Sequence, residues 1–348
     1  MIIEKKENSK RETIRINSLS IGYKTKNYST IVATGINTKL FCGELTCLLG
    51  ANGVGKSTLL KTLSAFLPKM EGSIEILGRK IESYSEREIS TTIGVILTDR
   101  SIVRNMSVNE LVSMGRYPYT GFWGRLNYHD NEKVSRAIEE VHIENLRSRK
   151  IDSLSDGELQ KAMIAKVLAQ ETPIVFLDEP TAFLDYPSKV EIMQFLRNLS
   201  RESSKTIFIS THDLELALQI ADRIWLMDRN NGITAGIPED LALNGFLNNL
   251  FAKKGIFFDL NTGLFKVSDN YHAKIKCTGH GQQYAMVRKA LQRNGIEASS
   301  SIESEVSVEA VDSTKHEIII RFPFGKSVTV KSIENMLDAI SNIPIPDC

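Results

Sequence analysis

The sequence has little that would cross-link a protein covalently or through a metal ion. Its 348 residues include only four cysteines, and none of them belongs to a CxxC pair; they are Cys42, Cys47, Cys277 and Cys348. Disulfide frameworks and cysteine zinc sites both depend on paired spacings of that kind. The sequence therefore gives no sign of either, and we expect reduced thiols in a cytosolic protein.

The chain also lacks a charge excess and a long apolar run. Lys and Arg number 43 against 42 Asp and Glu, which gives a net charge of +1. A nucleic-acid partner usually selects for a clear basic excess, so none is indicated. No apolar stretch approaches the roughly 18 residues that cross a bilayer. We recognise no signal peptide, and we expect residues 1–12 to form a flexible tail.

What is present fits a soluble globular protein. The apolar fraction is 42% and the charged fraction is 24%. A chain of this length is long enough for two domains, each with its own core. The character of the sequence changes near residue 250, where we place the boundary between a domain at 13–250 and a smaller one at 251–348. In the smaller domain, helices that follow paired strands indicate an α+β fold. The expected elements are a hairpin at Ile256–Val267 around residues 261–263, strands at Ala273–Cys277, Val306–Val311 and Glu317–Phe322, and helices at Tyr284–Asn294 and Val330–Ile340.

The most informative stretch is Gly50–Ser57, which has the pattern G-x-x-x-x-G-K-[ST]. A short apolar strand, Leu45–Leu49, precedes it. A helix is expected after it, with one apolar face made by Leu59, Leu60, Leu63, Phe66 and Leu67. Glycines allow a tight turn whose N–H groups surround an anion, and the helix adds its positive end. A glycine-rich turn with a chance lysine is the alternative, and it leaves the flanking strand and helix unexplained.

This loop predicts a triphosphate site. Lys56 can reach the β- and γ-phosphates, and the Ser57 hydroxyl can ligate Mg²⁺. The residues expected to bind the nucleotide here are Gly50, Ala51, Asn52, Gly53, Val54, Gly55, Lys56, Ser57 and Thr58.

Two further strands end in chemically active side chains. Pro173–Leu177 runs into Asp178 and Glu179, where the first acid can hold Mg²⁺ and the second can orient a water molecule. An acidic turn without chemistry is the alternative. Thr206–Ser210 runs into His212, which is either structural or, at the carboxyl end of a parallel strand, a ligand contact.

Three other positions have both a structural and a functional interpretation. Ser155 and Glu158 form an S-x-x-E capping box, and a helix start of this kind also binds phosphate. Tyr23, at a strand end, either stacks on an adenine ring or is an ordinary strand residue. The aromatic segment 115–123 is either a docking surface or a loop packed under its own helices.

Taken in order, these motifs resemble those of the ATPase subunit of ABC transporters. Asp178 follows Ser155 by 23 residues and His212 follows Asp178 by 34, which suits that family. The resemblance covers residues 13–245. The matching segments are Gly50–Ser57 (Walker A), Ile174–Glu179 (Walker B and the following glutamate), Ser155–Glu158 (signature), Ala182–Asp185 (D-loop), His212 (switch histidine) and Tyr23 (adenine-stacking aromatic).

The resemblance implies an α/β fold of the P-loop NTPase, ABC ATPase type. A mixed sheet, an antiparallel β subdomain and a helical subdomain at about 100–160 are expected, followed by the small α+β domain. Within the larger domain the sequence predicts turns at Glu71-Gly72 and Asn231-Gly232 and helix caps at Ser107 and Asp130. The smaller domain is expected to be structural or dimer-stabilising, with a regulatory ligand site as the alternative. Its His272 and His280 are too isolated to be predicted as metal ligands.

The resemblance also implies a mechanism with ATP and Mg²⁺. Two copies would enclose each ATP between the phosphate loop of one and the signature of the other. The catalytic residues would be Glu179, His212 and Lys56; the metal ligands Ser57 and Asp178; further nucleotide contacts Tyr23, Thr98, Ser155, Gly157, Glu158 and Asp185. The partners would be a permease and, indirectly, an extracytoplasmic binding protein. The location would be peripheral, at the cytoplasmic face of the plasma membrane.

A shorter region narrows the resemblance. Glu110–Val112 followed by Gly115–Pro118 resembles the importers of iron chelates, haem and cobalamin. A soluble ABC protein of DNA repair or ribosomes, or the ATPase of an exporter, is the alternative. Ser155 follows Ser57 by 98 positions, and the segment between them holds no sustained heptads of the repair type.

The sequence departs from the family pattern at two places. Asp156 replaces the usual glycine of the signature, where its carboxylate lies near a bound phosphate or turns outward. Thr98 stands at the position of the Q-loop glutamine. Because its hydroxyl is shorter than the amide it replaces, we expect Thr98 to reach the metal or the attacking water only through another water.

Overall fold

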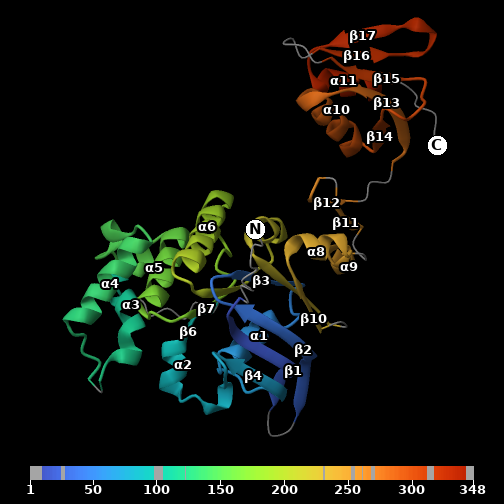
Figure 1. The fold of residues 1–348 in the computed structure, drawn as a ribbon. Helices are drawn as coiled ribbons and strands as arrows, with labels where there is room; N and C mark the ends of the chain where they lie inside the picture. Colours follow the sequence, from blue (N-terminus) through green and yellow to red (C-terminus); the bar gives the residue numbers. More distant parts are fainter. Residues whose placement is uncertain are drawn as a thin grey trace, which may run out of the picture. The chain divides into compact units, whose positions relative to one another are not determined.

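The computed structural model describes residues 10–24, 28–97, 105–121, 123–229, 232–251, 255–260, 262–267, 271–311 and 317–341. The chain divides into two compact units (Figure 1). The first comprises Met1–Ala252 with Phe258–Phe265, and the second Lys253–Phe257 with Lys266–Cys348. Most of the hairpin at 256–267 therefore goes with the first unit, whereas the sequence assigned it to the second domain. The exact boundary at residue 250 stays a prediction.

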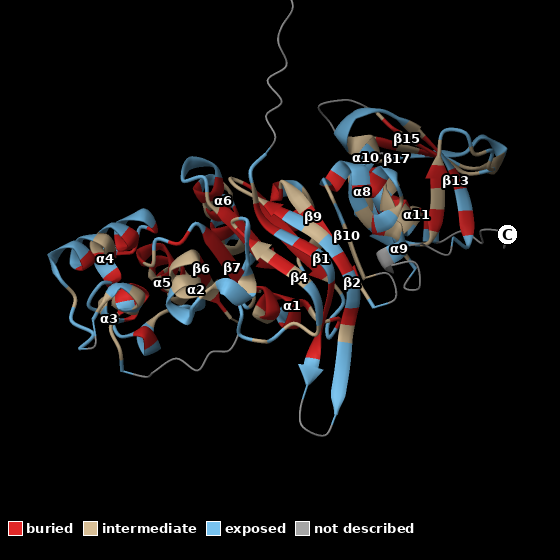
Figure 2. Cartoon of the chain, turned by 60° about the horizontal axis from the view of Figure 1, so that its bottom comes forward, coloured by how far each residue is buried: buried red, intermediate tan, exposed pale blue. Residues whose placement is uncertain are grey.

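A six-stranded sheet forms the centre of the first unit. Its strands, in spatial order, are β10 (Gly232–Gly236), β9 (Arg223–Asp228), β3 (Leu45–Gly50), β8 (Thr206–Ser210), β7 (Ile174–Asp178) and β6 (Ile93–Ile96). All neighbours are parallel except β10 with β9. The central strands are apolar runs buried on both faces, as parallel strands require (Figure 2). The predicted mixed sheet is confirmed.

The two faces of this sheet belong to two separate cores. Alternate residues such as Phe176, Phe208 and Trp225 face helix α1 (Lys56–Leu63) and the second sheet. Phe208 and Trp225 stack with ring centroids 4.7 Å apart. The residues between them, such as Leu177 and Ile209, face the helices on the other side. This alternation follows from the two-residue repeat of a strand.

The second sheet of this unit is antiparallel, as predicted. Its order is β2 (Ser29–Phe41), β1 (Glu12–Lys24), β4 (Glu71–Ile76) and β5 (Arg79–Lys80). The predicted turn at Glu71-Gly72 is wrong, because both residues lie in β4, where Gly72 has φ 81° at a register shift against β1. The predicted tail 1–12 lies mostly outside the described residues, and Glu12 already belongs to β1.

The helix after the phosphate loop is shorter than predicted. It ends at Leu63, and Ala65 adopts a left-handed conformation with φ 62°. Phe66 and Leu67 therefore lie beyond the end of the helix and are not part of its apolar face. Phe66 is 61% exposed.

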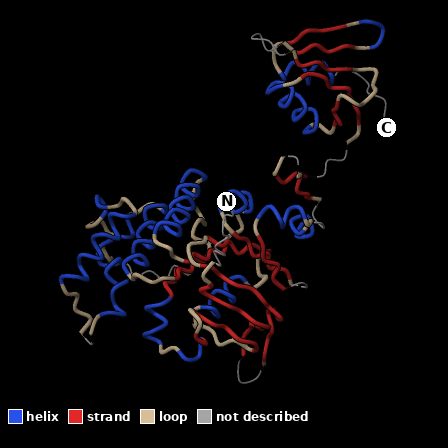
Figure 3. The backbone as a smooth tube through the Cα atoms, in the orientation of Figure 1, coloured by secondary structure: helices blue, strands red, loops and turns tan. Residues whose placement is uncertain are grey.

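Helices dominate the chain between β6 and β7 (Figure 3). They are α3 (Val108–Ser113), η2 (Met114–Tyr119), α4 (Tyr128–Glu140), η3 (Glu144–Leu146), η4 (Ile151–Ser153) and α5 (Asp156–Ala169); α2 (Glu86–Thr92) and η1 (Ile81–Ser83) precede β6. Ser107 caps α3, as predicted. The prediction that Asp130 caps α4 is wrong: Asn127 is the cap, and Asp130 is the third helical residue of the same capping box.

The rest of the first unit completes the covering of the sheet. Its elements are α6 (Tyr186–Glu202), α7 (Leu214–Ile220), α8 (Pro238–Leu243) and α9 (Phe246–Phe251), together with residues 258–265 of the hairpin formed by β11 (Ile256–Asp259) and β12 (Leu264–Val267). The predicted hairpin around residues 261–263 is confirmed. The predicted turn at Asn231-Gly232 lies partly outside the described residues, although β9 and β10 pair as a hairpin would.

The second unit is a five-stranded mixed sheet with two helices. The sheet order is β14 (Ile296–Ser299), β13 (Ala273–Gly279), β15 (Ser307–Ala310), β16 (Ile318–Arg321) and β17 (Ser327–Val330); the helices are α10 (Gly281–Arg293) and α11 (Ile333–Ser341), with a short η6 at Pro323–Gly325. The α+β architecture is as predicted. Strands β14 and β17 were not predicted, and Val330, expected in the last helix, pairs with Ile318 in the sheet.

Candidate functional site

The phosphate loop connects the end of β3 to the start of α1. Gly53 and Gly55 have φ values of 72° and 116°, and Gly55 caps the helix in a left-handed conformation. A Cβ built on Gly55 would lie 2.3 Å from Val32 Cγ1, so a larger residue would displace its neighbours as well as strain the backbone. The glycines thus fix the path of the loop.

Lys56 lies inside this loop. Its Nζ donates to the carbonyl oxygens of Gly50 at 2.9 Å and Ala51 at 3.3 Å, and the residue is 6% exposed. Burial lowers the pKa of Lys56, and the nearby carboxylates of Glu179 and Asp178 oppose that shift. The ammonium group is therefore a largely dehydrated cation, held beside the acid pair.

The two acidic residues, Asp178 and Glu179, stand at the end of β7. Strand β8 separates β7 from β3 in the sheet. Asp178 is buried and accepts a 2.5 Å hydrogen bond from the Ser210 hydroxyl. The Glu179 amide donates to both the hydroxyl and the carbonyl oxygen of Ser210, each at 3.0 Å. Glu179 itself has φ 51°, an unusual value for this residue type that these bonds hold in place.

His212 follows β8 and faces the acid pair. Its Nδ1 lies 3.4 Å from Glu179 Oε1, and its side chain is 55% exposed. Strands β3, β8 and β7 are consecutive in the sheet, so their carboxyl ends bring Lys56, the acid pair and His212 to one edge. The three predicted catalytic residues, Lys56, Glu179 and His212, therefore lie at one edge of the sheet within a single copy of the chain.

Tyr23 also meets the phosphate-loop helix. Its hydroxyl lies 2.9 Å from Thr58 Oγ1, while 44% of the residue is exposed. The exposed ring leaves room for a planar group to stack against it. Both the predicted stacking role and an ordinary strand-end role are compatible with this position.

Sequence reasoning missed Arg229, which comes directly after β9. Its Nη2 donates to the Gly53 carbonyl oxygen at 3.1 Å. Strand β9 lies next to β3, so the two strands end at the same edge of the sheet. The only signal in the sequence was an arginine at a strand end, and its meaning depends on which strand is the neighbour.

The signature residues form a separate surface. Ser155 caps α5, and the capping box with Glu158 is confirmed. Glu158 also faces Arg149 at 3.4 Å, and its hydrogen bonds from Ser155 lower its pKa. Asp156 is exposed, at the first helical position. This end of α5 is a helix N-terminus open to solvent.

A cavity of about 320 Å³ lies beside this helix start. Ser155, Gly157 and Lys161 line it from α5, and Ser188 from α6. Asp185 caps α6 by accepting from the Ser188 amide at 3.1 Å, and hydrogen bonds from the Ser188 hydroxyl and amide lower the pKa of Asp185. Among the described residues that line this cavity, none comes from the phosphate loop, so the structure does not unite the two predicted halves of the nucleotide site. Thr98 lies outside the described residues.

The donor set at the edge of the sheet suits a magnesium–nucleotide complex. Hydroxyl and carboxylate oxygens, here from Ser57 and Asp178, are the ligands that Mg²⁺ prefers. The loop amides and Lys56 supply the positive groups that a triphosphate needs. Gly50 leaves no space for a side chain, since a Cβ would lie 2.6 Å from the Met227 carbonyl oxygen. This close approach keeps the backbone at the loop's base compact.

Comparisons with known proteins agree with this geometry. A family model for ABC transporters matches residues 33–182, and one for the iron ABC transporter C-terminal domain matches residues 272–341. An uncharacterized ABC transporter ATP-binding protein of Methanocaldococcus jannaschii is 37% identical over 74% of this chain and 87% of its own length. The ferric enterobactin transport ATP-binding protein FepC of Escherichia coli is 32% identical over 71% and 89%.

A solved structure extends the similarity to three dimensions. The protein cbiO1 of Clostridium perfringens, part of the ABC transporter complex cbiONQ, superposes with a TM-score of 0.59 at 29% identity. The superposition covers 70% of this chain and 96% of the other. The predicted P-loop NTPase fold of the ABC type is confirmed. The chain belongs to the ABC transporter ATP-binding proteins, and it is an ATPase.

Proposed function

We propose that this chain powers an importer of iron chelates, with haem and cobalamin as the alternative solutes. The observation that carries the proposal is the second family match, to the iron ABC transporter C-terminal domain at residues 272–341. The relatives include a probable siderophore transport system ATP-binding protein, a ferric enterobactin transport ATP-binding protein and an iron(3+)-hydroxamate import ATP-binding protein. The alternatives, an exporter ATPase or a soluble ABC protein, have less support, because these relatives are named for transport or import of iron compounds.

The proposed roles of the site residues follow from their positions. Lys56 and the loop amides neutralise the triphosphate, and Ser57 with Asp178 would hold Mg²⁺, which supplies charge neutralisation between the phosphates. Glu179 orients the attacking water, supported by its rigid left-handed backbone at the end of β7. His212, 3.4 Å from Glu179, contacts the γ-phosphate.

Two copies of the chain are proposed to complete each site. A single phosphate loop leaves the γ-phosphate open to water on one side. The N-terminus of α5, capped by Ser155 and exposed, presents backbone N–H groups and the positive end of the helix dipole on a separate surface. Head-to-tail pairing would bring this surface of one copy to the phosphate loop of the other. Hydrolysis removes the bridging charge, so the copies separate.

The proposal includes a membrane-embedded permease partner. In the part of the chain that the structure describes, no helix is long and apolar enough to cross a membrane. Attachment to the cytoplasmic face of the plasma membrane would therefore come through the permease. An extracytoplasmic binding protein would deliver the solute on the other side.

The first test separates nucleotide binding from hydrolysis. We expect Glu179→Gln to bind ATP while its turnover falls about 10²-fold or more, because the water loses its orienting group. Phosphate release and filter binding of labelled ATP measure the two properties. Glu215→Gln, which changes an exposed carboxylate on α7, is the matched control. Near-normal hydrolysis by the Glu179 variant would remove it from the proposed role.

The second test addresses the solute. A strain lacking the chain is grown on iron chelates, haem or vitamin B12 as the only source of iron or cobalamin, with and without the restored gene. We expect growth on one class to depend on wild type and to be lost with Glu179→Gln. Growth unaffected on every source, with ATPase activity intact, would contradict import of these solutes and leave the enzymatic assignment standing.

A further inference from the structure

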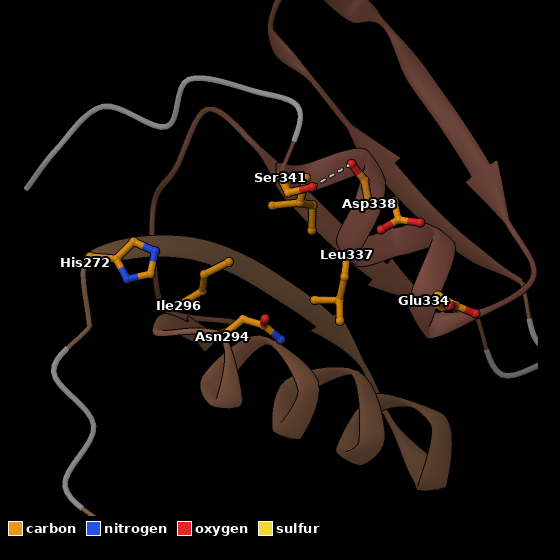
Figure 4. A pocket seen from close by; sticks show the side chains of 8 residues that line it. His272, Asn294, Ile296, Glu334, Leu337, Asp338 and Ser341 are labelled. Carbon is orange, nitrogen blue, oxygen red and sulfur yellow. Dashed lines mark hydrogen bonds between the residues drawn. The ribbon is translucent and has the colours of Figure 1, made fainter.

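The second unit contains a cavity that the ATPase chemistry does not use. It has a volume of about 550 Å³, within the range of small-molecule sites. It lies between α11 on one side and strand β14 with the end of α10 on the other (Figure 4). Its size and position raise the question of what ligand its walls suit.

The floor of the cavity is apolar. Ile296 on β14 is 5% exposed, and Leu337 on α11 is half-buried. Figure 4 shows these two side chains directed into the space between the strand and the helix. Ile340, 2% exposed, completes this surface and belongs to the core of the unit. Because Ile296 and Ile340 are almost fully buried, Leu337 is the floor residue that keeps apolar surface open to the cavity, and a hydrocarbon body would cover that surface.

The rim of the cavity is acidic. Glu334 and Asp338 are four residues apart on α11, so they lie on the same face of the helix as Leu337. Both are exposed carboxylates. His272 and Asn294 complete the polar rim, and none of the described lining residues is lysine or arginine. An anionic ligand would therefore meet two like charges, whereas a cation would be attracted.

We propose that this cavity binds a small organic cation, in which an ammonium group is joined to a hydrocarbon body. The body lies on Ile296 and Leu337, and the ammonium group faces Glu334 and Asp338. A bare metal ion would gain nothing from the apolar floor, and a hydrocarbon acid would be repelled at the rim. The combination of floor and rim thus selects an amphiphilic amine.

The test uses the full chain with hexylammonium as the probe and hexanoate as the matched anion. Methyl NMR of isoleucine- and leucine-labelled protein follows Ile296, Leu337 and Ile340 during titration. We expect saturable shifts of these methyl signals with hexylammonium and none with hexanoate at equal concentration. The absence of saturable shifts, or equal shifts with both probes, would overturn the proposal.

Substitution of the rim tests the charge requirement. Glu334→Gln combined with Asp338→Asn keeps the side-chain shapes, and we expect it to raise the Kd of hexylammonium about fivefold or more. Glu305→Gln changes an exposed carboxylate of the same unit that does not line the cavity, and it should leave the Kd unchanged. An unchanged Kd in the double variant, with the other methyl signals at their wild-type positions, would also overturn it.

Discussion

At the scale of single residues, Arg229 contacts the phosphate loop although it lies outside the Gly50–Ser57 motif. It is exposed, yet its guanidinium donates to the Gly53 carbonyl oxygen at 3.1 Å. This hydrogen bond restrains the Gly53 carbonyl group, in the middle of the loop. Arg229 therefore stabilises the loop path from outside the loop, through a neighbouring strand.

We expect Arg229→Gln to raise the Kd for ATP about two- to tenfold, which corresponds to the loss of one hydrogen bond. Isothermal titration calorimetry measures it. Arg136→Gln, at an exposed arginine of α4 that pairs with Glu140, is the control. A wild-type Kd in the Arg229 variant would show that the loop keeps its path without this contact.

Also at the scale of single residues, Gly115 shows how the start of the segment 115–123 is packed. A Cβ built there would lie 2.1 Å from the Lys166 carbonyl oxygen and 3.2 Å from Ala169 Cβ. The glycine is thus needed because η2 packs directly against the backbone of α5. Its neighbour Arg116 is buried, while Trp123 is 82% exposed. The segment begins as a packed structure and ends at the surface, so neither interpretation of it holds throughout.

Gly115→Ala is expected to lower the free energy of unfolding by about 2 kcal/mol or more, since backbone must move to admit the methyl group. Urea denaturation followed by circular dichroism measures this change. Gly121→Ala is the matched control, because a Cβ there meets nothing within 4 Å. Equal stability of the two variants would contradict the close packing.

At the scale of elements, a buried arginine joins the parts of the helical region. Arg116 donates from Nε to Asp130 at 3.0 Å, and from Nη1 to the Ala169 carbonyl oxygen at 2.8 Å and to Glu171 at 3.0 Å. Its guanidinium also stacks 4.1 Å from the Tyr119 ring centroid. These contacts tie η2 to the start of α4 and the end of α5. The motif that suggested a transporter branch therefore has a structural role here.

This pair makes stability depend on pH. Burial alone would raise the pKa of Asp130, but hydrogen bonds from the Asn127 amide and Arg116 outweigh it and lower the pKa. A carboxyl whose folded-state pKa is depressed stabilises the fold above its unfolded value of about 3.9. That contribution is lost as the pH falls through the folded-state pKa. Acid should therefore loosen the helical region.

We expect Asp130→Asn to lower the free energy of unfolding at pH 7 by about 2 kcal/mol, because the buried Arg116 loses one of its two carboxylate partners and keeps only Glu171. The difference between wild type and variant should shrink as the pH falls from about 5 to about 2. Urea titrations across this range measure it. A difference that does not change with pH would assign the effect to packing alone.

At the scale of the whole molecule, the two units have separate hydrophobic cores. The core of the second unit includes Val308 and Ile320, both fully buried, and no described residue of the first unit belongs to it. A core of its own normally gives a unit its own unfolding transition. We therefore expect two transitions for the full chain in denaturant.

Ile320→Ala is expected to shift one of these transitions, with a loss of about 2–5 kcal/mol from the cavity it creates. Tryptophan fluorescence reports the first unit, because both tryptophans lie there, and circular dichroism reports both units. Val328→Ala, at a 44% exposed position of β17, is the control. A single transition shifted as a whole by Ile320→Ala would contradict independent cores.

Contacts between residues close in sequence were predictable. The S-x-x-E box at Ser155 depends on groups three residues apart, so its pattern is sufficient. The same rule placed the cap of α4 wrongly. The capping box there is formed by Asn127 and Asp130, so the cap lies three residues before the predicted one. The end of α1 was missed because Ala65, without a glycine's signal, adopts the left-handed conformation that stops the helix.

The sequence by itself determined the phosphate loop, since its glycines, lysine and serine act through a backbone path of eight consecutive residues. Only the tertiary structure decided that Arg229 contacts that loop and that Glu179 and His212 lie at the same edge of the sheet. Those contacts depend on the strand order β9-β3-β8-β7, which joins segments more than a hundred residues apart in the chain. The same holds for the acidic cavity of the second unit, where the last helix lies across the cavity from β14, a strand that the sequence did not predict.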